Sequence, residues 1–175
     1  MNHVKRKLAG GLALGALLGL GIVPAAIAAS QVHKAAAKPV FPRRGAAFVG
    51  VSSQKSGKLA LPVDLRASAN GRLMSRFDIQ WAASCQSTAG RGSYGGLSIT
   101  LNKAITAPGV FSDTGSFSRM FSNGDKGQFT IKLFGRFSSP TRAAGTFRVQ
   151  VAITDSAGAS TDNCDSGVVN WVVTD

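Results

Sequence analysis

Apolar and polar residues alternate with a period of two along much of this chain, and no other feature constrains the fold as strongly. Successive side chains of a β-strand point to opposite faces, so such runs are typical of strands with one face in a core. Five runs follow the pattern: residues 59–65, 73–81, 97–101, 129–133 and 147–153. In the second run we expect Leu73, Phe77, Ile79 and Trp81 to face inward. The expected outward residues are Arg72, Met74, Arg76, Asp78 and Gln80.

Turn signals and composition support strands over helices. Asn70-Gly71 and Asn123-Gly124 are typical hairpin turns, and residues 168–173 are apolar on both faces, which predicts a central strand. The chain has no Glu and 21 Gly, and Gly is a poor helix former. Phe outnumbers Tyr ten to one, which indicates core aromatic residues. We therefore expect an all-β fold, an antiparallel β-sandwich or small β-barrel of about eight strands.

The N-terminal segment has the pattern of an export signal. Lys5, Arg6 and Lys7 precede an apolar run that ends in Ala26-Ile27-Ala28, so residues 1–28 are predicted to be a cleaved signal peptide. The alternative is an uncleaved membrane anchor. With cleavage, membrane contact is transient and the protein is secreted or held in the cell envelope. Residues 29–44 are predicted to be a flexible basic leader, followed by one domain over residues 45–175.

Export makes the two cysteines interpretable. Cys85 and Cys164 are an even pair in an oxidising compartment, which predicts one structural disulfide. A redox-active pair would more often have the C-x-x-C spacing. Two cysteines cannot complete a tetrahedral metal site, and we predict no metal there.

The residues of acid-base and nucleophilic catalysis are scarce in the expected domain. Both histidines, His3 and His33, precede it, so we predict no catalytic residues, no enzyme activity and no cofactor. Residues 90–95 match G-x-G-x-x-G, but a strand-like run follows them, so a Gly-rich hairpin loop is the better interpretation. Residues 155–165 are rich in oxygen-bearing side chains, which leaves weak calcium binding as an alternative to an ordinary polar loop.

The charge distribution offers one candidate binding surface. The formal net charge is +12, and 13 of the 20 cations lie in residues 45–175 beside all eight Asp. Outward positions place Arg72, Arg76 and Gln80 on one strand, Lys132 and Arg136 on another, and Arg148 and Gln150 on a third. If these strands are neighbours, they form a cationic polar face for an anionic wall polymer or glycan, with Arg72, Arg76, Lys132 and Arg148 as the candidate binding residues. No nucleic acid is expected, because aromatic residues do not interleave with these cations and the chain is exported. The alternative is an ordinary solvated sheet face.

Four segments carry a family resemblance: residues 48–54 (F-x-G-x-S-S-Q), 115–118, 135–149 and 164–171. The chain resembles a family of uncharacterised exported bacterial proteins with recurring G-x-F, G-R-F, A-x-G-T-x-R-V and C-x-x-G-x-V-x-W patterns. The resemblance spans most of residues 46–173. It implies a β-rich extracellular domain with one disulfide, and it implies no known activity and no functional residues.

Two functional hypotheses follow. The first is a non-catalytic secreted or envelope β-domain that binds glycan, anionic wall polymer or protein. The alternative is a secreted enzyme or enzyme inhibitor with an unrecognised site of Asp and Ser. The absence of Glu, and of His from the expected domain, favours the first.

Overall fold

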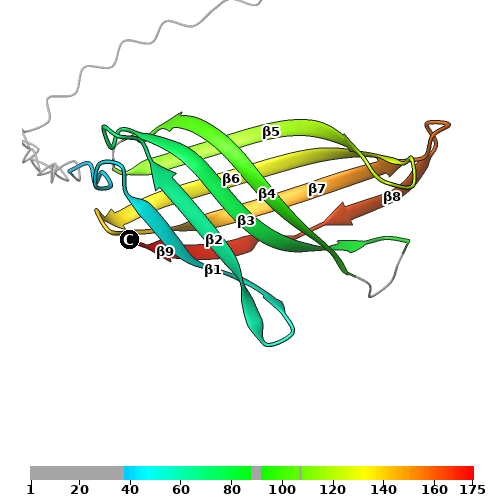
Figure 1. The fold of residues 1–175 in the computed structure, drawn as a ribbon, viewed down its shortest axis with the longest axis horizontal. Helices are drawn as coiled ribbons and strands as arrows, with labels where there is room; N and C mark the ends of the chain where they lie inside the picture. The colour runs from blue at the N-terminus through cyan, green and yellow to red at the C-terminus, as the bar shows by residue number, and fades with distance from the viewer. Residues whose placement is uncertain (1–37, 88–91, 107) are drawn as a thin grey trace, which may run out of the picture. The chain divides into compact units, whose positions relative to one another are not determined.

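The computed structural model describes residues 38–87, 92–106 and 108–175, and the predicted signal peptide lies outside them (Figure 1). These residues form nine strands and no helix, which confirms the all-β prediction. None of their segments is a helix long and apolar enough to cross a lipid bilayer. The strands are β1 (Ala47–Ser56), β2 (Leu59–Ala67), β3 (Leu73–Cys85), β4 (Gly92–Ala104), β5 (Val110–Met120), β6 (Lys126–Ser139), β7 (Arg142–Thr154), β8 (Ser160–Asp165) and β9 (Val169–Thr174).

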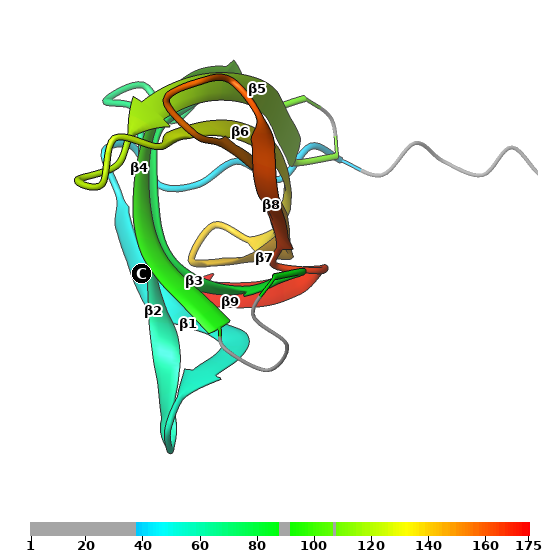
Figure 2. The same ribbon diagram turned by 90° about the vertical axis from the view of Figure 1, so that its right-hand side faces the viewer.

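Six of the strands close into a barrel. β3, β2, β1, β9, β7 and β8 pair in that order, all antiparallel, and β8 pairs back with β3 (Figures 1 and 2). β4 extends the sheet beside β3, while β6 and then β5 extend it beside β7. β9 lies between β1 and β7, which confirms the central position expected from its apolar faces.

Besides β1 and β5, which also lie outside the alternating runs, β8 is a strand that sequence periodicity did not predict. It lies in the polar stretch that we expected to be a loop, and Cys164 is its one buried side chain. Alternation therefore gave no signal for β8, and the described part of the chain forms nine strands instead of about eight.

The inward side chains fill the space between the strands. Phe77 packs against Trp171 and Phe147, with ring centroids 5.4 and 6.1 Å apart. Trp81 and Trp171 are 6% and 3% exposed, as expected for core residues. The indole N–H groups of both tryptophans lack an acceptor among the described residues.

A bulge in β3 overturns part of the predicted facing pattern. In the pairing of β2 with β3, the adjacent residues Arg66 and Ala67 face Arg76 and Met74, so Ser75 is an extra residue in β3 and the alternation changes phase. Met74 is consequently fully buried, whereas we expected it to face outward. From Phe77 onward the inward positions are those that the sequence predicted.

The two predicted Asn-Gly turns connect hairpins. Gly71 lies between β2 and β3 with φ of 69°, and Gly124 lies between β5 and β6 with φ of 88°. Glycine adopts this left-handed region without the clash that a Cβ atom would cause.

Packing contacts begin before residue 45. Val40 and Phe41 pack against the core, and the backbone N–H of Arg43 donates to the carbonyl of Pro140 at 3.2 Å. Arg43 also forms an ion pair with Asp175, with Nε and Oδ2 3.2 Å apart. Residues 40–44, which we expected to belong to a flexible leader, are therefore part of the folded unit.

Candidate functional site

The predicted disulfide joins the two strands that close the barrel. Cys85 in β3 and Cys164 in β8 are bonded, which confirms the pairing expected from the sequence. They are direct cross-strand partners, and the β3–β8 ladder contains one further residue pair, Ser84 with Asp165. The disulfide thus reinforces a closure that has few backbone pairings.

A polar hollow of about 520 Å³ lies beside this closure, over β3, β6, β7 and β8. Strand register places Thr130, Gln150, Asp165 and Ser84 in one row across the four strands. A second row contains Gln128, Ala152 and Asn163, and Gln86 follows the end of β3. We call this hollow the amide groove, because Gln86, Gln128, Gln150 and Asn163 supply primary amides, each with donors and an acceptor.

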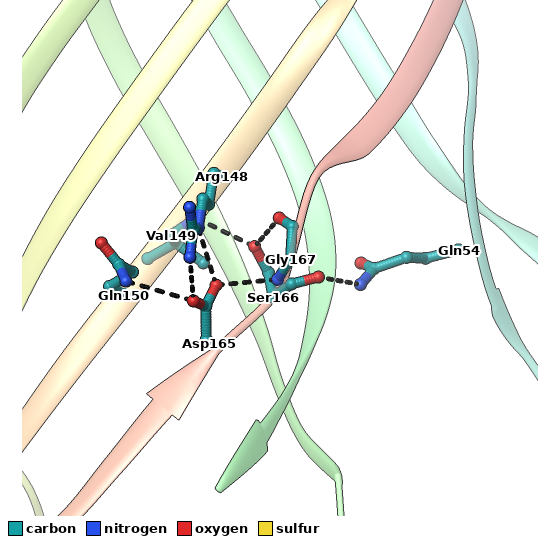
Figure 3. Close-up of polar contacts among 7 residues, drawn as sticks. All are labelled: Gln54, Arg148, Val149, Gln150, Asp165, Ser166 and Gly167. Carbon is teal, nitrogen blue, oxygen red and sulfur yellow. Dashed lines mark hydrogen bonds and ion pairs between the residues drawn. The ribbon is translucent and has the colours of Figure 1, made fainter.

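Asp165 is the one acidic residue of the amide groove, and its charge is compensated (Figure 3). The Arg148 guanidinium donates to the carboxylate with both Nε and Nη2, with Nε 3.0 Å from Oδ1. Gln150 Nε2 donates to Oδ2 at 3.1 Å. The hydrogen bond from Arg148 lowers the pKa of Asp165 and raises that of Arg148. Asp165 is therefore ionised at neutral pH, unlike a general acid.

The turn after β8 holds Asp165 in place. The backbone N–H of Gly167 donates to Asp165 Oδ1 at 2.8 Å, and Val149 N–H donates to Ser166 Oγ at 2.9 Å. Gln54 approaches from β1, and its Nε2 donates to the Ser166 carbonyl at 3.2 Å (Figure 3). These bonds connect β1 and β7 to the turn, so the carboxylate sits on a rigid support.

Gln54 also explains the end of the F-x-G-x-S-S-Q segment. Its side chain donates to the Ala82 carbonyl at 2.7 Å and accepts from Ala82 N–H at 2.9 Å, as a neighbouring strand would do. The β1–β2 pairing is irregular between Val51 and Lys55, so the amide links β1 to β3 where β1 leaves the ladder. Gly50, earlier in the segment, allows β1 to approach β9, since a Cβ there would lie 2.0 Å from the Val172 carbonyl oxygen. In this structure these residues have structural roles.

The outward side chains of β6 continue the amide groove along the barrel surface. Every second residue of this strand is exposed, and we call the following five the β6 track: Gln128, Thr130, Lys132, Phe134 and Arg136. Phe134 is 45% exposed between the two cations, in contrast to the core role expected for phenylalanines. Neither Lys132 nor Arg136 forms an ion pair with any residue that the structure describes.

The strand order does not bring the four predicted cationic residues together. Lys132 and Arg148 are cross-strand neighbours on β6 and β7. Arg72 precedes β3, and Arg76 lies within it. The pairing of β3 with β8 begins eight residues beyond Arg76, which is about 26 Å along a strand. The single four-residue face is therefore not formed, because alternation predicts the face of a residue and not the neighbours of its strand.

Three of these four cations already have partners. Arg76 Nε lies 2.7 Å from Asp78 Oδ2, and Arg148 pairs with Asp165. The Arg72 guanidinium lies 4.3 Å from the centroid of the Phe41 ring. Lys132 is thus the one of these four cations whose charge is available, and Arg136, which was expected on the same outward face of its strand, joins it on the β6 track.

The oxygen-rich residues 155–165 do not converge on an ion position. Asp155 Oδ1 accepts from the N–H groups of Ala157 and Ala159, both at 2.9 Å, and so closes a turn. Asp162 accepts from the Ser87 hydroxyl, which lowers the pKa of Asp162. Its carboxylate lies near the sulfurs of Cys85 and Cys164, but disulfide sulfurs are not thiolate ligands for a metal.

The G-x-G-x-x-G match belongs largely to a strand. β4 begins at Gly92, while Gly90 and Arg91 lie outside the described residues. A strand here is inconsistent with a phosphate-binding loop that opens a helix.

No protein-family model, curated protein or solved structure matches this chain.

Proposed function

We propose that this protein is an exported binding domain whose amide groove and β6 track hold a linear anionic glycan. The observation that carries the proposal is the order of side chains along β6, in which polar groups at the groove lead to Lys132, Phe134 and Arg136. The disulfide is consistent with an extracellular location. Export itself rests on the sequence pattern of residues 1–28.

The amide groove suits the hydroxyl groups of a sugar. A hydroxyl both donates and accepts hydrogen bonds, and so does a primary amide. Gln150 gives a hydrogen to Asp165, which leaves its carbonyl oxygen as an acceptor toward the groove. Gln128 accepts from the Ser118 hydroxyl, which leaves its NH₂ group as a donor. The groove therefore presents both kinds of group from adjacent strands.

The β6 track supplies charge and an apolar surface. Lys132 and Arg136 flank Phe134 at two-residue spacing, so about 13 Å of strand carries cation, ring and cation in line. A ring between two uncompensated cations favours a sugar carrying carboxylate or phosphate groups over a neutral one. Because the track lies on a paired strand, binding orders little of the backbone, which limits the entropic cost.

The charge state of Asp165 favours binding over catalysis. Glycosidases and related hydrolases use one carboxyl group that stays protonated near neutral pH. The guanidinium of Arg148 holds Asp165 in the opposite state. The enzyme or inhibitor alternative would need Asp and Ser side chains elsewhere, and a panel of hydrolase substrates tests it directly.

A charge-matched titration tests the proposal. The purified protein is titrated with heparin, as a sulfated glycan probe, and with neutral dextran at low salt and at about 0.5 M salt, where the Debye length is about 4 Å. We expect heparin to bind and dextran to bind weakly. The variant Lys132→Ser/Arg136→Ser should bind heparin about tenfold more weakly, equivalent to about 1.4 kcal/mol.

The control is Arg72→Ser/Arg76→Ser, which removes the same charge from another part of the barrel. This variant should keep most of the affinity. Equal losses in the two variants would show attraction to net charge alone and would overturn the proposed track, as would salt-independent binding.

A further inference from the structure

We infer that the protein has a second site, on the core-facing side of its sheet, that takes a small apolar carboxylate at the seam between β4 and β5. The two strands are the ends of the hydrogen-bonded path and form no ladder with each other in the part of the chain that the structure describes. Lys103 Nζ and Asp113 Oδ1, 2.9 Å apart, bridge the seam at one place. Further along β5, toward Phe117 and Arg119, the seam opens into a cavity of about 130 Å³.

The walls of this seam cavity are mostly apolar. Phe117 and Phe129 stack with centroids 4.7 Å apart and an interplanar angle of 3°, and Ile153 and Leu97 contribute aliphatic surface. Phe117 is 36% exposed, so the aromatic wall reaches the mouth. An apolar cavity of about 150 Å³ holds one benzene molecule, so this volume fits a single ring or a short acyl chain.

Two polar groups of the protein indicate which polar group the ligand carries. Trp81 lines the cavity, is 94% buried, and has an indole N–H without an acceptor among the described residues. A buried donor without a partner is costly, and a ligand oxygen would satisfy it. Trp171 is similarly unpaired, but it does not line the seam cavity, so only Trp81 is available to a ligand there.

Arg119 supplies the positive charge. It lines the cavity from β5, is exposed, and forms no ion pair with a described residue. An oxygen acceptor for Trp81 and a negative charge for Arg119 together describe a carboxylate on a compact apolar body. Phe129 lines the seam cavity from the buried face of β6, whereas the β6 track lies on the exposed face of that strand, so the two sites are independent.

The test follows the indole N–H resonances during titration with benzoate and, separately, with benzyl alcohol, which has the ring and an acceptor without the charge. Trp81→Phe assigns the Trp81 signal, and Trp171 serves as an internal control. With nine heavy atoms, benzoate should bind with a dissociation constant of about 1 mM. We expect the Trp81 N–H signal to move downfield while that of Trp171 stays in place.

Two variants locate the binding. Arg119→Gln should weaken benzoate several-fold and leave benzyl alcohol unchanged, and Ile153→Phe should block both by filling the cavity. Folding of each variant is checked by the unperturbed Trp171 signal. The inference is overturned if benzoate leaves Trp81 unshifted well above millimolar concentration, if both indoles shift alike, or if Ile153→Phe binds as the wild type does.

Discussion

Reduction of the Cys85–Cys164 disulfide should destabilise the barrel more than any surface change. The bond joins residues 79 positions apart, so it removes a large loop-closure entropy from the unfolded chain. The chain-entropy relation gives about 4.5 kcal/mol at 25 °C for a loop of this length. That is a large part of the 5 to 15 kcal/mol that is typical of whole domains.

Urea denaturation of the oxidised and reduced wild-type protein measures this contribution. With a slope of about 2 kcal/mol/M, the midpoint should fall by about 2 M on reduction. Reduction keeps both sulfurs in place, so the comparison isolates the covalent link. The variant Cys85→Ala/Cys164→Ala should lose somewhat more, because Cys164 is 5% exposed and its truncation leaves a small void.

The structure also predicts where the reduced barrel opens first. The β3–β8 ladder contains two registered residue pairs, one of which is the disulfide-bonded pair, whereas β6 and β7 pair along most of their length. Hydrogen exchange should therefore accelerate most at the β3–β8 closure. A loss of stability below about 1 kcal/mol, with unchanged exchange at this ladder, would refute the entropic argument.

Three further predictions concern single side chains. Gln54→Ala removes the side chain that hydrogen-bonds both the N–H and the carbonyl of Ala82, and it should lower the free energy of unfolding in urea by about 1 to 3 kcal/mol. Lys55 is exposed, so Lys55→Ala should be nearly neutral. Gly145→Ala should cost at least about 2 kcal/mol in stability, because the added Cβ would lie 2.5 Å from the Trp171 ring. The matched control is Gly96→Ala, whose added Cβ would have no atom within 4 Å. Similar melting temperatures for the two variants would contradict the packing around Gly145. Asp165 has a lowered pKa in the folded state, so its stabilising effect is present above its unfolded pKa of about 4 and is lost as the pH falls through the folded value. The melting-temperature gap between wild type and Asp165→Asn should thus be open at pH 7 and narrow in acid, and a gap independent of pH would count against the ion pair.

The sequence predicted what depends on local alternation and on residue type. The β class, the hairpin turns at Gly71 and Gly124, the burial of both tryptophans and the disulfide all follow from such signals. Met74 departed from its predicted face because a single added residue, Ser75, inverts the parity of β3. β8 was missed because a strand with one buried side chain carries no periodic signal.

The site was less accessible to sequence reasoning, for a geometric reason. The alternation of the sequence correctly predicted that Lys132 and Arg148 face outward. It could not predict that the part of β3 that contains Arg76 is distant from both residues, because strand order is not encoded in alternation. The amide groove combines residues from four strands, and surface glutamines follow no motif. The one feature of the groove that the sequence indicated was the outward position of Gln150 beside Arg148. Only the register of β6, β7 and β8 shows which residues neighbour Gln150.

The most direct test of the account is to map where an anionic glycan touches the protein. Side-chain amide resonances of Gln128 and Gln150, with the backbone signals of β6, are followed as a heparin oligosaccharide is added. The account predicts that both amides and the β6 signals from Gln128 to Arg136 shift together, with one saturating isotherm, and that the signals around Arg72 and Arg76 stay in place. Shifts centred on β3, or weak shifts spread over every exposed cation without saturation, would contradict it.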